Sequence, residues 1–145
     1  MLNVQVESSY DAEKNIGIIK FINKPLSFED MDYFADQITG LAKKGGQNKT
    51  WNITDISQMG MASPKLVSYY QGLIKPIRDK YVVDYCVICE KTMERVAAQL
   101  FNILMREKSP IVRSLDEAMD WTIKEQEKRG RFIPLEKVNG FSLRG

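Results

Sequence analysis

The chain has 145 residues, of which 43% are hydrophobic and 28% charged, and its formal net charge is +2. A length of this order suits one globular domain with a hydrophobic core of its own. So small a charge, with no long run of Lys and Arg, argues against a nucleic-acid partner. The sequence contains no histidine, which excludes every triad, metal site or proton shuttle that depends on imidazole.

Targeting and metal-binding signals are also missing from the sequence. Residues 1–7 lack the basic start and apolar core of a signal peptide, and no apolar run is long enough to cross a membrane. Cys86 and Cys89 are the only cysteines, and they would need carboxylates or a second chain to complete a zinc site. We therefore expect a cytoplasmic protein that is not transmembrane and holds no metal or cofactor.

The first segments predict a β-hairpin followed by a helix. Residues 3–10 and 15–22 have the apolar patterns of strands, with a short polar stretch between them. Ser27 stands three residues before Asp30, which is the spacing of a helix-capping box. A helical repeat of apolar residues follows, and a pair of glycines at 45 and 46 ends it. The repeat consists of Phe28, Met31, Ala35, Ile38, Leu41 and Ala42.

The next strand, residues 50–56, leads through a loop of small and polar residues into a second helix. Ser63 caps that helix, and Pro64 suits its first turn, where a missing N–H leaves no partner unsatisfied. Pro76 should end or kink the helix, because proline removes a backbone hydrogen bond in a helix interior. The predicted apolar stripe of this helix consists of Leu66, Val67, Tyr70, Leu73, Ile74 and Ile77.

Residues 81–89 form an apolar, β-branched segment that we place near the centre of the sheet. Cys86 and Cys89 within it have the spacing of a redox pair. Such a pair needs its first thiol at a helix N-terminus, so buried structural thiols are the simpler interpretation here. A further helix is expected from about Thr92. Its apolar face would consist of Met93, Val96, Ala97, Leu100, Phe101 and Leu104.

The last predicted elements are a short strand over residues 111–113 and a helix that Ser114 and Glu117 open as a capping box. Residues 126–145 are charged and then apolar, as expected for a tail that packs on the domain or on a second subunit. The fold class is therefore α/β, with a mixed, mostly parallel five-stranded sheet and four helices in the order ββαβαβαβα. A single domain over residues 1–125 would hold all of them.

Two short motifs connect this order of elements with a known superfamily. The third strand ends in Asp55-Ile56-Ser57, and the last helix begins with a phrase that contains Ser114, Glu117, Ala118 and Trp121. Both resemble the STAS superfamily, in particular its SpoIIAA-like branch, which is related to the lipid-binding CRAL-TRIO domains. The resemblance spans roughly residues 3–125. It implies a STAS/SpoIIAA-like fold and a regulatory role in protein binding, and its CRAL-TRIO kinship implies a small apolar ligand as the alternative.

The chain departs from this superfamily at its regulatory motif. Anti-sigma-factor antagonists of the superfamily carry Asp-Ser-Ser-Gly or a close variant before the second helix, and the first Ser is phosphorylated. Here the corresponding residues are Met61-Ala62-Ser63-Pro64, so Ser63 lacks both the preceding Asp and the following Gly. Ser63 is a candidate phosphosite because a phosphate at a helix N-terminus is stabilised by the macrodipole. A simple helix cap is the plainer alternative.

Ligands and partners of alternating α/β folds lie beyond the carboxyl ends of the strands. This rule places the candidate recognition site in the loop after residues 50–56 and on the helix that follows. Asp55 and Ser57 equally suit a turn that satisfies backbone donors, and Tyr70 equally suits the core. The residues predicted for binding are Asp55, Ser57, Met59, Met61, Ser63 and Tyr70.

These observations favour a non-catalytic regulatory or protein-interaction module, expected to form a homodimer and to bind a protein partner through this loop and helix. The alternative is a carrier or sensor of a small apolar, lipid-like ligand held between the helices and the strand ends. An enzyme ranks third, because without histidine a general base must be a carboxylate or lysine. Asp55 is the only residue that we would name for that role.

Overall fold

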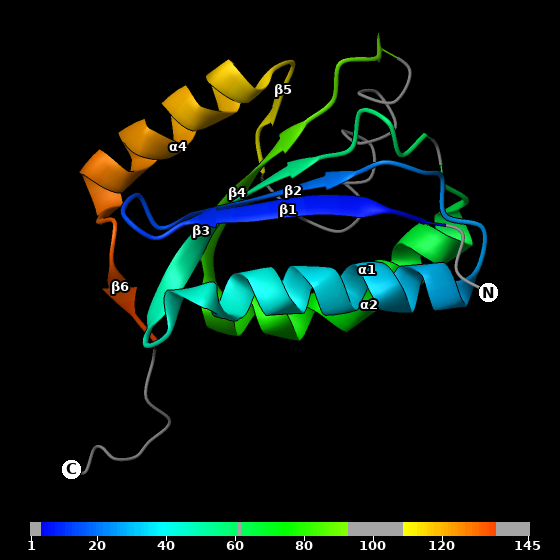
Figure 1. Ribbon diagram of the computed structural model, residues 1–145, viewed down its shortest axis with the longest axis horizontal. Helices are drawn as coiled ribbons and strands as arrows, with labels where there is room; N and C mark the ends of the chain where they lie inside the picture. The colour runs from blue at the N-terminus through cyan, green and yellow to red at the C-terminus, as the bar shows by residue number, and fades with distance from the viewer. Residues whose placement is uncertain (1–3, 61, 93–108, 136–145) are drawn as a thin grey trace, which may run out of the picture.

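The computed structural model describes residues 4–60, 62–92 and 109–135. In this part of the chain a mixed sheet has α1 and α2 on one face and α4 on the other (Figure 1). The elements are, in chain order, β1 (Val6–Asp11), β2 (Ile16–Phe21), α1 (Phe28–Ala42), the 3₁₀ turn η1 (Lys43–Gly45), β3 (Asn48–Asp55), α2 (Pro64–Tyr81), β4 (Val82–Ile88), β5 (Ile111–Val112), α4 (Leu115–Arg129) and β6 (Ile133–Pro134).

The predicted mixed, mostly parallel sheet is confirmed, although the described residues give it six strands instead of the expected five. Strands β1 to β5 lie side by side in sequence order, and β6 pairs with β3. β1 runs antiparallel to β2, whereas β2, β3, β4 and β5 are parallel neighbours. Three α-helices are present in the described ranges. The helix predicted from Thr92, with its apolar face from Met93 to Leu104, falls on residues 93–108, outside the described residues.

Serine side chains begin the three described α-helices, as the sequence predicts. The Oγ atom of Ser27 accepts a hydrogen bond from the Asp30 backbone N–H at 3.1 Å, and that of Ser114 accepts one from Glu117 at 3.2 Å. Ser63 caps α2 in the same way, and Pro64 occupies the first turn. Each cap satisfies an N–H group that has no partner within its own helix.

The second helix does not end at Pro76 but continues to Tyr81. Proline removes the N–H that would bond the carbonyl four residues earlier, which here belongs to Gly72. Pro76 and Gly72 are both exposed. Water can therefore hydrate the freed carbonyl, so the interruption costs less than it would inside a core.

The last helix extends beyond residue 125, where we expected it to end, and reaches Arg129. Gly130, with φ 108°, then turns the chain, and Ile133 pairs with Lys49 at the start of β3 in an antiparallel bridge. Residues 126–135 are therefore part of the sheet and its covering helix. Ile133, an apolar residue of the expected tail, therefore lies against β3.

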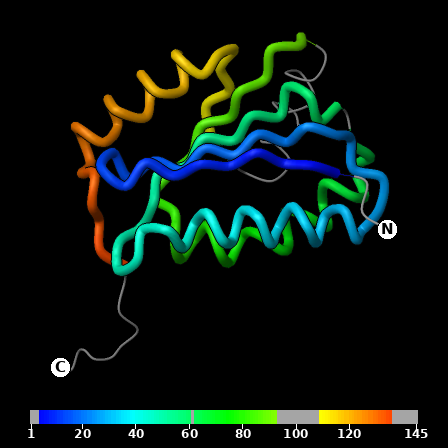
Figure 2. The backbone as a smooth tube through the Cα atoms, in the orientation of Figure 1, coloured from blue at the N-terminus to red at the C-terminus, as the bar shows by residue number. Residues whose placement is uncertain are grey.

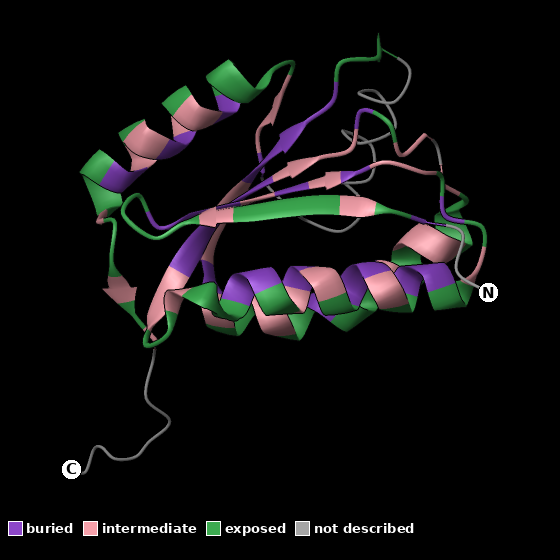
Figure 3. Cartoon of the chain, in the orientation of Figure 1, coloured by how far each residue is buried: buried purple, intermediate pink, exposed green. Residues whose placement is uncertain are grey.

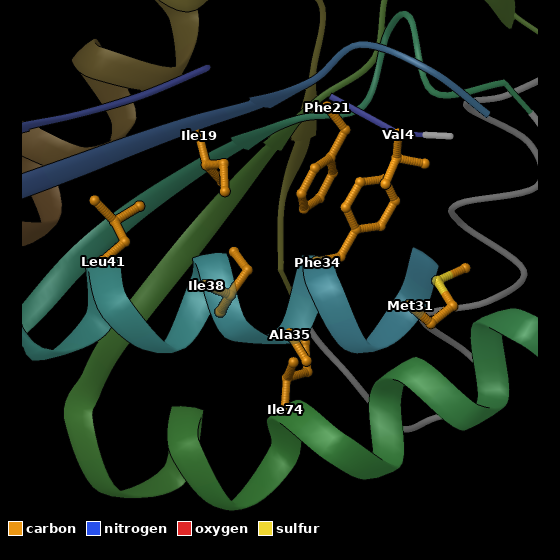
Figure 4. Close-up of a cluster of buried hydrophobic side chains, with 9 residues drawn as sticks. All are labelled: Val4, Ile19, Phe21, Met31, Phe34, Ala35, Ile38, Leu41 and Ile74. Carbon is orange, nitrogen blue, oxygen red and sulfur yellow. The ribbon is translucent and has the colours of Figure 1, made fainter. Parts of the chain in front are cut away.

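Two hydrophobic cores lie on opposite faces of the sheet. The α1/α2 core contains Phe21 and Phe34, whose ring centroids are 4.2 Å apart (Figure 4). Figure 3 shows that β1 is largely exposed, while the strands behind it are mostly buried. The α1/α2 core consists of Val4, Ile19, Phe21, Met31, Phe34, Ala35, Ile38, Leu41 and Ile74. The α4 core consists of Ile16, Trp51, Ile53, Cys86, Ile88 and Ala118.

A buried side-chain amide joins the hairpin turn to the segment that follows α4. Asn15 has φ 57° and is fully buried. Its Oδ1 accepts a hydrogen bond from the Tyr10 hydroxyl at 2.6 Å, and its Nδ2 donates to the carbonyls of Lys49 and Arg131 at 2.8 and 2.7 Å. The turn between β1 and β2 accordingly lies beside the segment that links α4 to β6 (Figure 2).

We expect Asn15→Gly to lower the free energy of unfolding by about 2–4 kcal/mol, because buried carbonyls lose their donor. Asn15→Ala should cost about 1 kcal/mol more, since alanine also disfavours the left-handed backbone. Urea unfolding followed by circular dichroism measures both. Lys14→Ala, in the same exposed turn, is the control and should stay within about 0.5 kcal/mol of the parent. An Asn15→Gly protein as stable as the parent would contradict this account.

Candidate functional site

The loop after β3 is held by hydrogen bonds of Asp55 and Ser57. The Asp55 carboxylate accepts from the Ser57 backbone N–H at 2.9 Å, which closes a turn. Ser57 is only 3% exposed, and its Oγ accepts from the Glu90 N–H at 3.1 Å. The structure therefore places Asp55 and Ser57 together in the turn geometry that the sequence offered as the alternative to binding.

Met59, in this loop, and Tyr70, on α2, both pack toward the interior. Both contact the α1/α2 core, and the Tyr70 ring meets Phe21 and Phe34 edge-on with centroids 6.4 and 6.3 Å away. Burial raises the pKa of the Tyr70 hydroxyl well above its usual range, although the nearby Arg78 guanidinium partly opposes the rise. Met61, the sixth predicted site residue, lies outside the described residues.

Ser63 is the predicted site residue that is open to solvent. It is exposed at the start of α2, and its Oγ accepts from the Leu66 N–H at 3.3 Å. Lys65 is the second residue of the helix, and its ammonium lies 5.6 Å from the centroid of the Phe28 ring. A group added to Ser63 would therefore stand at the positive end of α2, close to a lysine and an aromatic ring.

An apolar patch extends from the start of α1 along α2 as far as Leu73. Phe28 and Tyr69 stack with centroids 4.6 Å apart, and the Tyr69 hydroxyl donates to Asp32 at 2.6 Å. Leu73 lies one turn beyond Tyr69 and is 38% exposed, so this member of the predicted apolar stripe of α2 faces outward. Gln71 is buried on α2 instead. The apolar patch consists of Leu26, Phe28, Tyr69 and Leu73, which are all exposed.

A separate cleft of about 480 Å³ lies on the α4 side of the sheet. It is bounded by the carboxyl ends of β2, β3 and β4, by β1 and by the first turn of α4. Asp55 is the predicted site residue that lines it. The complete lining is Glu7, Ser8, Ser9, Ile18, Lys20, Asp55, Ile88, Glu90, Arg113, Ser114 and Leu115.

Strand register explains why these residues meet. Glu7 on β1 is paired with Lys20 on β2, and Lys20 is paired with Asp55 on β3. Their side chains share the face of Ile16 and Trp51, which α4 covers. Sequence reasoning missed Glu7 and Lys20 because the alternation of a strand shows two faces but not which residues of other strands lie alongside.

Both cysteines are buried, and neither forms a disulfide within the described residues. Burial raises the pKa of the Cys86 thiol to about 12, and the nearby carboxylates of Asp84 and Glu117 add to the rise. A thiol with so high a pKa forms little thiolate at neutral pH, which agrees with the structural interpretation. No group of three or more His, Cys, Asp or Glu side chains suited to a metal ion occurs within residues 4–60, 62–92 and 109–135.

Comparison with solved structures identifies the fold of this chain. No family model and no curated protein matches it. An uncharacterised protein of the DUF3478 family with a SpoIIAA-like fold, from Shewanella loihica PV-4, superposes with a TM-score of 0.60 at 13% identity, covering 84% of this chain and 97% of its own. This chain has a SpoIIAA-like fold. The fold that its sequence resemblance implied is thereby confirmed.

A second structure with similar architecture is a candidate anti-sigma factor antagonist from Thermotoga maritima. Its TM-score is 0.58 at 16% identity, and the alignment covers 81% of this chain and 93% of that one. Because the sequence identity to both structures is low, the similarity establishes only the SpoIIAA-like arrangement of strands and helices. None of the helices in the described ranges is long and apolar enough to span a membrane.

We expect stability to fall as the pH rises from about 9 to about 12, because the buried Cys86 thiol keeps its proton in the folded protein but loses it near pH 8.5 when unfolded. A group whose pKa is raised on folding contributes its full stabilisation at pH values below its pKa in the unfolded chain. This contribution is lost as the pH rises through its pKa in the folded protein. Tyr70 acts in the same direction. Urea midpoints measured across this range should decline less for a Cys86→Ala, Tyr70→Phe double variant. Parallel declines in the two proteins would contradict the prediction.

Proposed function

We propose that this protein is a non-catalytic, SpoIIAA-like regulatory module that works in the cytoplasm by binding another protein. The observation that carries the proposal is the apolar patch of Leu26, Phe28, Tyr69 and Leu73 beside the capped start of α2. Exposed apolar side chains that occur singly are ordinary, but clustered ones mark interaction surfaces.

The composition of the patch suits a protein partner. Its centre is an aromatic pair, Phe28 and Tyr69, a residue class enriched at interfaces. Lys65 and Asp32 stand at its margin, each in contact with one of the two rings, so the patch has the polar rim of a typical interface. The aromatic side chains are already held in place, which reduces the entropy lost on binding.

The loop over residues 55–63 is the second part of the proposed recognition surface. Ser57 anchors its first residues through bonds with Asp55 and Glu90, which hold the chain just after β3 in a turn. The Thermotoga protein, described as a candidate anti-sigma factor antagonist, supports a regulatory role for a domain of this shape. In this proposal Asp55 positions the loop and is not a general base.

The alternative function, transport of a small apolar ligand between the helices and the strand ends, gains no support from this region. Met59, Leu66 and Tyr70 fill the space there by packing against the α1/α2 core. The cleft described above lies on the other face of the sheet and is lined largely by charged and polar side chains. We therefore carry the protein-binding proposal forward.

Photo-crosslinking in the native cells tests this proposal. We expect p-benzoylphenylalanine in place of Tyr69 to form an adduct with one other protein, because this side chain would be covered in the complex. The same crosslinker in place of Glu127, which is exposed on α4, is the control and should give no such adduct. Mass spectrometry identifies the partner, and native mass spectrometry of the purified chain reports the expected homodimer.

The identified partner then allows a quantitative comparison of two exposed phenylalanines. Phe28→Ser should weaken binding at least about tenfold, as expected for an aromatic residue at the centre of an interface. Phe132→Ser removes a phenylalanine that is 53% exposed outside the patch, and it should leave the affinity unchanged. Absence of any adduct at position 69, or equal effects of the two variants, would overturn the proposal. Adducts with a second copy alone would reassign the patch to the homodimer.

Ser63 offers a test of charge at the same surface. Asp and Asn both cap helices well, so Ser63→Asp and Ser63→Asn should each keep the melting temperature of the parent. If Ser63 is a phosphosite within the recognition surface, the added negative charge of Asp should change partner affinity about fivefold or more, whereas Asn should not. Calorimetric titration with the crosslinked partner measures this. Equal affinities for the two variants would leave Ser63 a cap alone.

A further inference from the structure

We propose that the cleft on the α4 side binds a small zwitterionic molecule, of the class of an α-amino acid or dipeptide with an apolar side chain. The cleft, of about 480 Å³, falls within the range of pockets that hold small ligands. It shares Asp55 with the protein-binding loop but is otherwise built from different residues, so the two proposals can fail independently.

The charges around the cleft are of both signs. Lys20 and Arg113 supply positive charge, while Glu7, Asp55 and Glu90 supply negative charge. Within the described residues, none of these five side chains forms an ion pair with another residue. A ligand that carries one charge of each sign can satisfy both sets at once, whereas a simple anion or cation would meet repulsion from one of them.

The order of the charges across the sheet supports this class of ligand. Paired register places Lys20 between Glu7 and Asp55, with neighbouring strands about 4.8 Å apart. Asp55 and Glu90 flank Ser57, which bonds to both residues, so negative charge is concentrated at the ends of β3 and β4. An ammonium group fits there, and a carboxylate fits toward Lys20 or across the cleft toward Arg113.

Apolar groups complete the site and define the body of the ligand. Ile18 and Ile88 form part of the cleft floor, and Leu115 stands at its edge with 46% of its surface exposed. A hydrophobic side chain on the ligand would cover Leu115 and gain from the area removed from water. At the start of α4 the Ser114 hydroxyl already accepts from the Glu117 N–H, and the Glu117 carboxylate accepts from the Arg113 N–H.

A ligand bound in the cleft would change the environment of the recognition loop. The Asp55 carboxylate and the Glu90 backbone are the two groups bonded to Ser57, and Ser57 anchors the chain that leads to Ser63. A ligand ammonium that draws on Asp55 therefore competes with the bond to the Ser57 N–H. The backbone amides of Ser57 and Glu90 are consequently the atoms whose environment binding should change.

Two-dimensional NMR of the ¹⁵N-labelled full chain tests the site. Leucine and leucyl-leucine are the zwitterionic probes, and leucinamide and N-acetylleucine carry only the positive or only the negative charge. We expect at least one zwitterion to shift the amide signals of Ser57, Glu90 and Lys20. Both single-charge probes should bind at least about fivefold more weakly than that zwitterion, because each loses one charged hydrogen bond. Comparison of the first two probes distinguishes a free amino acid from a dipeptide.

Charge-neutral variants with matched controls locate the interaction. Asp55→Asn keeps an oxygen that can accept from the Ser57 N–H but removes the charge, and Lys20→Gln removes the central cation. Each should weaken zwitterion binding about fivefold to tenfold. Asp36→Asn and Lys14→Gln change exposed charges outside the cleft lining and should have no effect.

Three outcomes would overturn the proposal. The first is that no amide signal shifts with either zwitterion at concentrations up to about 10 mM, which would mean a dissociation constant above about 10 mM. The second is equal affinity for the zwitterions and the single-charge probes. The third is a set of shifts confined to residues outside the cleft. None of these results bears on adducts formed through position 69, which test the protein-binding proposal separately.

Discussion

The buried side chain of Asn15 is the constraint on which the arrangement of the chain depends. It satisfies the carbonyls of Lys49 and Arg131, which are far apart in sequence, from a left-handed turn that most residues disfavour. The end of α4 is held to the same corner by other bonds: Gln126 donates to the Lys14 carbonyl at 2.7 Å and the Trp51 indole to that of Gly130 at 3.2 Å. Hairpin, central strand and last helix are therefore tied together at one end of the sheet.

This attachment determines which part of the sheet stays open. The C-terminal end of α4 is held beside Lys14 and Trp51. Its first turn forms a wall beside the carboxyl ends of β3 and β4. The other face is closed by α1 and α2, and there the outward sides of the two helices carry the apolar patch. The SpoIIAA-like framework thus offers two surfaces, a charged cleft and an apolar patch, and Asp55 with its turn lies between them.

Local signals explain how much of this could be predicted. Capping at Ser27, Ser63 and Ser114 involves residues three apart in sequence, and the strand and helix periods depend on neighbours along the chain. The continuation of α2 past Pro76 could not be predicted, because it depends on the exposure of Gly72 to solvent. The pairing of Ile133 with Lys49 was not predictable from a two-residue strand, since its only signal is the partner across the sheet. In the candidate site, the sequence pointed to the loop after β3 but not to the outward orientation of Leu73.

The sequence by itself determined the order of β1, β2, α1, β3, α2, β4, β5 and α4 and the caps that begin these helices, because both follow from short-range periodicity and backbone chemistry. The SpoIIAA-like fold was implied by its resemblance to the STAS superfamily. Only the tertiary structure decided that Glu7, Lys20 and Asp55 form one row and that Phe28 stacks on Tyr69. Strand register and helix packing join residues tens of positions apart, and a shift of one residue would turn each strand's side chains to the opposite face. The surfaces proposed for binding depend on that register, so no local pattern could have specified them.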